Sequence, residues 1–184
     1  MAIDRKISTP SDWVLRIAPV IRPRGTVLDV ACGGGRHSRY LSNQGFRVTA
    51  IDRDVSAISD VAAIEVLEAD LEDGSPWPLA GRRFDGVIVT NYLFRPLFPT
   101  LTDSVADGGV LIYETFGTGN ERFGRPRNPD FLLRPGELLQ AVSGRLSVLG
   151  YQAGTVNIPS PAVVQRIAAI RRSSVADPIR LPAP

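Results

Sequence analysis

The stretch from Thr26 to Gly35 constrains the fold of this chain more than any other segment. Thr26 to Val30 is an aliphatic and β-branched run, and three consecutive glycines, Gly33 to Gly35, follow it closely. Such a run is typical of a buried strand, and a helical pattern begins directly afterwards at Arg36. Glycines at a strand-to-helix turn allow the backbone to approach a ligand, because no side chain stands in the way. The segment therefore predicts an α/β unit with a ligand at this turn.

A second apolar run, Phe46 to Ile51, ends in Asp52. In a nucleotide-binding βαβ unit, an acidic residue at this place receives the two hydroxyls of a ribose. The dinucleotide pattern G-x-G-x-x-G would need its third glycine at Ser38, so the turn is not of the pyrophosphate-binding kind. These features together indicate a nucleoside ligand without a pyrophosphate.

The turn resembles the first motif of the class I S-adenosylmethionine-dependent methyltransferases, in which glycines alternate after an acidic residue. It reads Asp29-x-Ala31-x-Gly33-x-Gly35, with Ala31 in place of the first glycine. The resemblance covers residues 11–172 and implies the cofactor S-adenosyl-L-methionine, with S-adenosyl-L-homocysteine as product. It also implies that Asp29 faces the ammonium group of the cofactor, directly or through water.

The same resemblance assigns the cofactor site by position. Asp52 would bind the ribose hydroxyls, Arg53 would lie beside the adenine, and Asp70 with Leu71 would meet the adenine amine. Aspartates that end a strand are also common caps, and this alternative is open for Asp52 and above all for Asp70. The residues expected at the cofactor are Asp29, Ala31, Cys32, Gly33, Gly35, His37, Asp52, Arg53, Asp70, Leu71 and Thr90.

Candidate catalytic residues follow the fourth and fifth expected strands. The resemblance implies that Asn91 and Tyr92 line the methyl-transfer site, and Glu114 is a further weak candidate for a general base. Cys32 is expected to be a small residue beneath the cofactor rather than a nucleophile, because no base is recognisable beside it. His37 is the only histidine, so it is expected to shape the pocket rather than to bind a metal, and no metal site is expected.

Further segments resemble small bacterial proteins of the tellurite-resistance type. They are GGGRHSRYL, FDGVIV, the residues around Tyr113 to Phe116, and RNPDFLLRPGELL. The resemblance implies methyl transfer to a small acceptor, anionic or soft, such as an oxyanion or a thiol-like group. Two alternatives stay open: an RNA or protein methyltransferase, and a cofactor-binding module without catalysis of its own.

The segment from Phe116 to Arg134 is long for a connection inside a compact domain, which favours a functional loop. It follows the fifth expected strand and is therefore expected at the ligand-binding edge of the sheet. We interpret it as a lid that offers arginines to an anionic acceptor, although a solvated loop is the plain alternative. Its arginines are Arg122, Arg125, Arg127 and Arg134.

The remaining pattern predicts an α/β fold with a doubly wound, mostly parallel seven-stranded sheet. Five strands alternate with helices, and two of these helices are expected over 56–62 and from Leu97 to Val105. Two late apolar runs are expected to pair as an antiparallel terminal hairpin. The 184 residues are expected to form one domain, 1–184, with flexible ends at 1–10 and 173–184. This pattern is typical of the class I methyltransferase, Rossmann-like sheet.

Composition and charge indicate the compartment and the partners of the protein. One cysteine, no secretory signal and no long apolar run favour a bacterial cytoplasm and no membrane partner. A net charge of +2 without a basic run speaks against a nucleic-acid partner. A monomer or a homodimer is expected.

Overall fold

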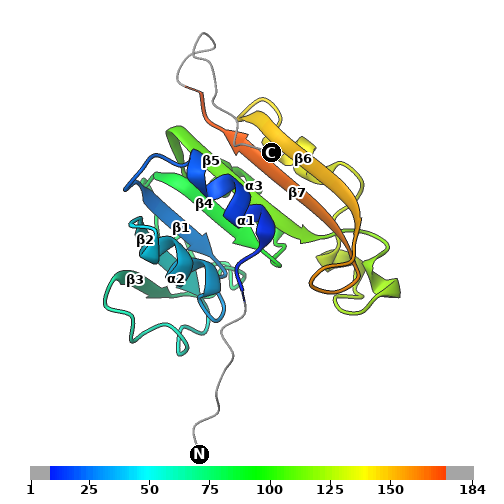
Figure 1. Ribbon diagram of the computed structural model, residues 1–184, viewed down its shortest axis with the longest axis horizontal. Helices are drawn as coiled ribbons and strands as arrows, with labels where there is room; N and C mark the ends of the chain where they lie inside the picture. Colours follow the sequence, from blue (N-terminus) through cyan, green and yellow to red (C-terminus); the bar gives the residue numbers. More distant parts are fainter. Residues whose placement is uncertain (1–8, 173–184) are drawn as a thin grey trace, which may run out of the picture.

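A seven-stranded sheet is the framework of the part of the chain that the computed structural model describes, residues 9–172 (Figure 1). The strand order is β3-β2-β1-β4-β5-β7-β6. β1 to β5 pair in parallel, and β7 pairs antiparallel with both β5 and β6. The strands are β1 (Thr26–Val30), β2 (Arg47–Asp52), β3 (Ile64–Glu68), β4 (Phe84–Thr90), β5 (Val105–Phe116), β6 (Ser147–Val156) and β7 (Ala162–Ile170). The predicted sheet with its terminal hairpin is confirmed.

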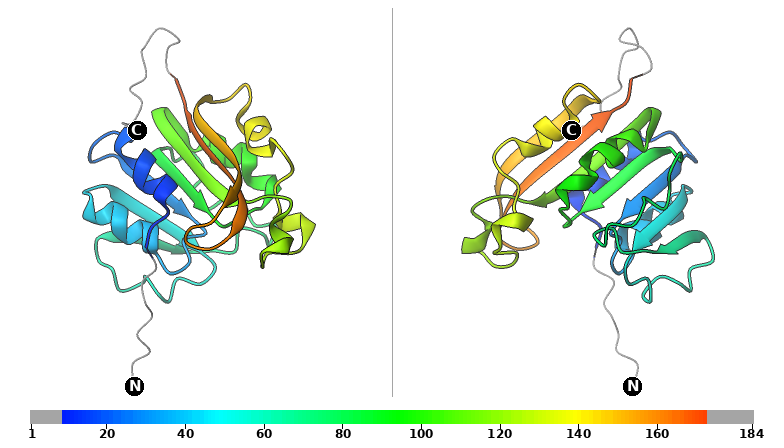
Figure 2. Two further views of the ribbon diagram at one scale, coloured as in Figure 1. Left: turned by 45° about the vertical axis from the view of Figure 1, so that its right-hand side comes forward. Right: turned by 180° about the vertical axis from the view of Figure 1, so that it is seen from behind.

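Helices cover both faces of the sheet (Figure 2). α1 and α2 pack Trp13, Val14 and Leu41 onto one face, and α3 and α4 pack Leu101 and Leu138 onto the other. The helices are α1 (Asp12–Ile17), α2 (Arg36–Asn43), α3 (Phe98–Asp103) and α4 (Glu137–Val142), with 3-10 turns η1 (Ala18–Val20), η2 (Arg95–Leu97), η3 (Asn120–Arg122) and η4 (Pro129–Phe131). Because both faces are covered, β4 is buried along its whole length.

Two helix predictions were wrong in detail. Residues 56–62 form turns instead of a helix. Hydrogen bonds from an amide to the carbonyl three residues earlier, such as Ile58 N to Val55 O, bend the segment, and Ile58 is buried there. The helix expected from Leu97 to Val105 ends at Asp103, because Val105 already pairs with Phe84 as the start of β5. The expectation of flexible ends falls, apart from residues 9–10, outside the described residues.

Gly35 begins α2 in a conformation that only glycine adopts easily, with φ of +72°. A Cβ added there would lie 2.3 Å from Cδ1 of Ile58, whose side chain is fully buried. The third glycine of the turn is therefore required both by its backbone angle and by the packing of the segment after β2.

Gly35→Ala is expected to lower the free energy of unfolding by about 2–4 kcal/mol, since the left-handed backbone and the overpacking each add about 1–2 kcal/mol. Gly34→Ala is the matched control, because a Cβ there meets no atom within 4 Å and its φ is not positive. Urea denaturation of both variants measures the difference. Equal destabilisation by the two substitutions would contradict this account.

Candidate functional site

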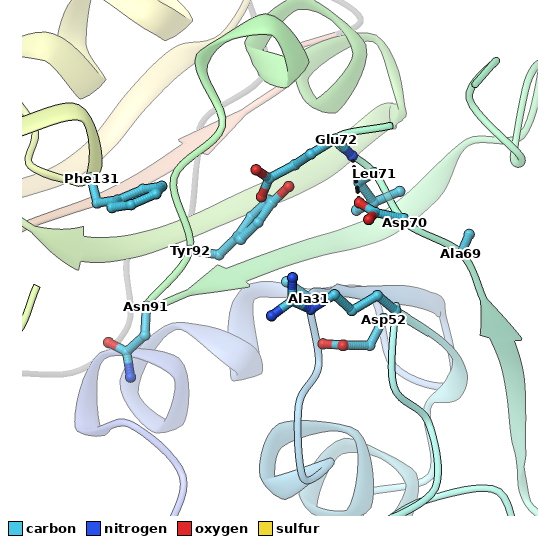
Figure 3. Close-up of a pocket in the computed structure, with 10 residues that line it drawn as sticks. Ala31, Asp52, Ala69, Asp70, Leu71, Glu72, Asn91, Tyr92 and Phe131 are labelled. Atoms are coloured by element: carbon cyan, nitrogen blue, oxygen red, sulfur yellow. Dashed lines mark hydrogen bonds between the residues drawn. The ribbon is translucent and has the colours of Figure 1, made fainter. Parts of the chain in front are cut away.

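A cavity of about 420 Å³ opens at the edge of the sheet where β1 to β4 end (Figure 3). In open α/β sheets, ligands bind at this carboxyl edge, and the volume lies within the range of small-molecule pockets. The lining residues are Ala31, Asp52, Arg53, Ala69, Asp70, Leu71, Glu72, Asn91, Tyr92 and Phe131. Most of them stand one or two positions after a strand, so the topology alone gathers them.

Two lining residues have a strained backbone. Ala31 after β1 has φ of +51°, and Asn91 after β4 has φ of +55°. Residues other than glycine rarely adopt this left-handed backbone conformation. The amide of Asn91 donates a hydrogen bond of 2.9 Å to the carbonyl of Glu114, which holds the turn in place. Strained residues that line a cavity favour a functional site over a purely structural turn.

Asp52 joins the glycine turn to the end of β2. Its Oδ2 accepts a 2.8 Å hydrogen bond from the amide of Gly33, and its Oδ1 accepts one of 3.0 Å from the amide of Asp54. Each carboxylate oxygen has a further lone pair, so Asp52 can still accept hydrogen bonds from a ligand in the cavity. Asp70 makes one such contact, accepting a 2.9 Å hydrogen bond from the amide of Glu72.

Asp29 lies beneath the turn and does not line the cavity. It is 1 % exposed, and its Oδ2 accepts a 2.5 Å hydrogen bond from the hydroxyl of Ser38 in α2. Burial raises the pKa of Asp29 to about 6, although the Ser38 hydrogen bond acts against this. The structure therefore shows Asp29 as a support of the turn, bonded to α2 rather than facing the open space.

Cys32 is buried in the same turn, and burial together with the charge of Asp29 raises the pKa of its thiol to about 12. The thiol therefore keeps its proton at neutral pH and is a poor nucleophile, as its small-residue role predicts.

His37 is buried and neutral. Burial lowers the pKa of its imidazole to about 3, and the positive charge of Arg36 adds to this. Its Nε2 accepts a 3.0 Å hydrogen bond from the amide of Ser11, so Nδ1 carries the proton and donates to the hydroxyl of Thr90 at 3.3 Å. Because both ring nitrogens are engaged, His37 joins α1, α2 and β4 and does not reach the cavity.

Glu114, expected among the catalytic residues, is buried away from the cavity lining. One carboxylate oxygen accepts a 2.9 Å hydrogen bond from the hydroxyl of Ser11, and the other lies 2.5 Å from Nε of Arg166 in an ion pair. Since both oxygens are occupied, Glu114 anchors the start of α1 to β5 and β7. A role as a general base has no support in this geometry.

Tyr92 points into the cavity, and Glu72 lies against it (Figure 3). The hydroxyl of Tyr113 donates a 2.9 Å hydrogen bond to the backbone carbonyl of Tyr92, which fixes the position of the residue. The hydroxyl of Tyr92 is buried beside the carboxylate of Glu72. Burial, and then the negative charge of Glu72, raises the pKa of this phenol, so it keeps its proton.

The loop after β5 contributes Phe131 to the cavity, and Arg95 holds it there. The guanidinium of Arg95 donates to the carbonyl of Asp130 at 2.5 Å and to that of Leu132 at 2.9 Å, on either side of Phe131. It also forms two hydrogen bonds to the carboxylate of Glu137, at 2.6 and 3.0 Å. Burial acts to raise the pKa of this carboxyl, but the hydrogen bonds from Arg95 and the amide of Arg134 lower it.

Sequence reasoning missed five of these residues: Ala69, Glu72 and Phe131 in the lining, and the pair Arg95 and Glu137. Glu72 carried a signal, since it stands two positions after Asp70 at the end of β3. Arg95 and Glu137 are separated by 42 residues in the sequence, and no local pattern indicated that they would pair. The arginines expected to face the acceptor, Arg122, Arg125 and Arg127, are exposed and outside the lining.

The predicted site residues thus divide into two groups. Those that line the cavity are Ala31, Asp52, Arg53, Asp70, Leu71, Asn91 and Tyr92. Those outside its lining are Asp29, Cys32, Gly33, Gly35, His37, Thr90 and Glu114. Within residues 9–172, no cluster of three or more His, Cys, Asp or Glu could hold a metal, and no helix could cross a membrane.

Comparisons with known proteins agree with this architecture. Residues 6–74 match the model of the family described as tellurite resistance protein TehB. The protein-L-isoaspartate O-methyltransferase of Chlorobaculum tepidum is 35% identical over 109 residues, which are 54% of this chain and 49% of that protein. The chain therefore spans about half the length of this curated relative.

Two solved structures show the same fold over most of the chain. TehB from Haemophilus influenzae has a TM-score of 0.72 at 19% identity, and the match covers 89% of this chain and 63% of that one. A TehB-like SAM-dependent methyltransferase from Corynebacterium glutamicum has a TM-score of 0.61 at 17% identity and covers 87% of both chains. The chain has the class I methyltransferase fold, and the resemblance found in the sequence is confirmed.

The raised pKa of Asp29 predicts a pH-dependent stability. Because the folded value of about 6 exceeds the ordinary 3.8, the folded state holds this proton longer and loses stability as pH rises between them. Without cofactor, Asp29→Asn should therefore gain about 2–3 kcal/mol relative to the parent between pH 4 and pH 7.

Urea denaturation across this range measures the difference, with Asp60→Asn as the control because that carboxylate is exposed. A difference that does not change with pH would show that Asp29 ionises as freely in the folded state as in the unfolded state.

Proposed function

We propose that this chain transfers the methyl group of S-adenosyl-L-methionine to a small-molecule acceptor, with S-adenosyl-L-homocysteine as product. The observation that carries the proposal is Asp52, which ends β2, accepts a hydrogen bond from the glycine turn and still lines the cavity. The similarity of residues 6–74 to TehB, and the methyltransferase relative, support the same activity. In this proposal residues 1–184 form one methyltransferase domain.

The residues at the cavity fit this cofactor. A Cβ added at Gly33 or Gly34 would meet no atom within 4 Å, so open space lies above the turn for a ligand close to the backbone. The carboxylate of Asp52 is placed to receive the ribose hydroxyls, with Arg53 beside the base. Asp70 and Leu71 lie at the same edge, on the side of β3, where the adenine amine would be met.

The chain contributes alignment rather than acid–base catalysis in this proposal. Bound S-adenosylmethionine supplies a methyl group that its sulfonium activates for in-line displacement. Asn91 and Tyr92 line the side of β4 and would orient the acceptor for in-line attack. Tyr92 keeps its proton, His37 is engaged at both nitrogens, and Glu114 is paired, so none of the three is a free base.

Two alternatives make different predictions. A cofactor-binding module would bind S-adenosylmethionine without transferring its methyl group, which a single-turnover assay detects. An RNA methyltransferase would bind RNA with an affinity that falls steeply with salt, because phosphate contacts release counterions. The described residues offer no aromatic or basic platform at the cavity beyond Arg53, Tyr92 and Phe131.

Asp52→Ala should weaken binding of S-adenosylmethionine by about 1.5–3 kcal/mol, the range for a hydrogen bond to a charged group. Isothermal titration calorimetry measures the affinity, and thermal melting without ligand shows whether the turn is disturbed. Asp60→Ala is the control, because Asp60 is exposed and outside the cavity lining. Unchanged affinity in Asp52→Ala would remove the main support for the nucleoside site.

The sequence resemblance implied an oxyanion or a thiol-like acceptor, and the loop arginines were interpreted as facing such an anion. Because Arg122, Arg125 and Arg127 are outside the cavity lining, a triple glutamine variant should keep both its cofactor affinity and its turnover. Turnover can be measured against tellurite, selenite and 2-mercaptoethanol. If the KM of the variant rises several-fold for the oxyanions alone, the loop arginines do contact an anionic acceptor, as a lid would.

A further inference from the structure

Phe131 is an exposed aromatic residue that the core does not explain. Its side chain is 47% exposed, whereas its neighbours Leu132 and Leu133 are buried at 3% and 0%. An exposed ring on a mobile loop would need no explanation, but the backbone around Phe131 is held on both sides by hydrogen bonds from Arg95. A fixed, exposed aromatic ring that lines a cavity is typical of a residue that contacts a bound ligand.

Tyr92 forms a second aromatic wall of the same cavity. Its backbone is fixed by the hydroxyl of Tyr113, independently of Arg95. Figure 3 shows the ring of Phe131 pointing toward that of Tyr92, with the carboxylate of Glu72 against Tyr92. Because the two rings are held by separate hydrogen bonds, the space between them is formed before any ligand arrives, which lowers the entropic cost of binding.

The charges of the lining are unfavourable to an anion. Asp52, Asp70 and Glu72 are acidic, and Arg53 is the one basic residue of the lining. Under the proposed function, Asp52 and Asp70 face the nucleoside of the cofactor. Glu72 is then the carboxylate left for the acceptor, beside two rings whose faces attract cations.

We propose that the acceptor is an amine carried on an apolar or aromatic body, held between Phe131 and Tyr92 with its nitrogen toward Glu72. The proposal rests on the methyl transfer proposed above and names its substrate class. A thiolate or an oxyanion would be repelled by Glu72, because like charges at short range in a partly dry site raise the free energy of binding.

The charge movement of the reaction agrees with this choice. The bound ammonium first loses one proton to water, and the lone pair of the neutral amine then forms the new N–C bond, while the C–S bond breaks and its electron pair stays on sulfur. The positive charge passes from sulfur to nitrogen, where the carboxylate of Glu72 stabilises it, and the product leaves as the methylated ammonium. A negative charge placed where positive charge develops favours the transition state.

A matched pair of probes tests the recognition directly. Phenethylammonium and phenylacetate carry the same ring and opposite charges, so their affinities for the complex with S-adenosyl-L-homocysteine isolate the effect of charge. We expect phenethylammonium to bind about 3- to 30-fold more tightly. Glu72→Gln should remove most of this preference, and Phe131→Ala should weaken phenethylammonium binding.

Two variants serve as matched controls. Phe123 is 46% exposed in the same loop but does not line the cavity, and Glu68 is an exposed acid at the end of β3. Phe123→Ala and Glu68→Gln should leave the affinities of both probes unchanged. If Phe131→Ala melts early, Phe131→Leu replaces it, because leucine keeps the apolar volume without the aromatic face.

Transfer of a labelled methyl group to phenethylamine, tellurite and 2-mercaptoethanol completes the experiment. Methylation of the amine that falls in Glu72→Gln and Phe131→Ala, with unchanged S-adenosyl-L-homocysteine affinity, supports the proposal. Equal binding of the two probes, or methylation of tellurite or the thiol without the amine, overturns it and leaves the methyltransferase assignment in place. A parent protein that binds neither S-adenosylmethionine nor S-adenosyl-L-homocysteine overturns the proposed function, and this inference with it.

Discussion

The parallel pairing of β1 with both β2 and β4 is the constraint on which the rest of the structure depends. Strands that run in parallel end at the same edge of a sheet, and β3 joins β2 in the same direction. Residues as far apart in the chain as Ala31, Asp52, Asp70 and Asn91 therefore surround one cavity. No side-chain contact between them is needed, because backbone hydrogen bonds between strands set their places.

Behind the cavity, burial controls the ionisation of the polar groups. Asp29 and Cys32 lie under the turn, and burial raises the pKa of each, while burial lowers the pKa of His37. A partly buried chain of contacts, from Arg166 through Glu114 and Ser11 to His37, continues to Thr90 at the end of β4. These groups hold α1, α2 and three strands together behind the site.

The front of the cavity is organised by a different principle. Arg95 crosses from the segment after β4 to the loop after β5, where it bonds two carbonyls and the carboxylate of Glu137. A guanidinium presents several donors in a fixed plane, so one side chain can hold a whole turn of the loop. Phe131 thereby lines the cavity, while Arg122, Arg125 and Arg127, the arginines expected of a lid, lie outside its lining.

The sequence by itself determined the strands of the sheet, the terminal hairpin, and the cavity residues that end or soon follow strands, such as Asp52, Asp70 and Asn91. These follow from local patterns: apolar periodicity, glycines at a turn, and acids at strand ends. It could not determine which of the predicted residues face the cavity. Asp29 and Glu114 were assigned by position alone, and the structure shows both occupied by partners elsewhere in the chain, Ser38 and Arg166. The short turn at 56–62 and the hold of Arg95 on Phe131 were also decided only by tertiary structure, because contacts across many residues leave no periodic signal along the chain.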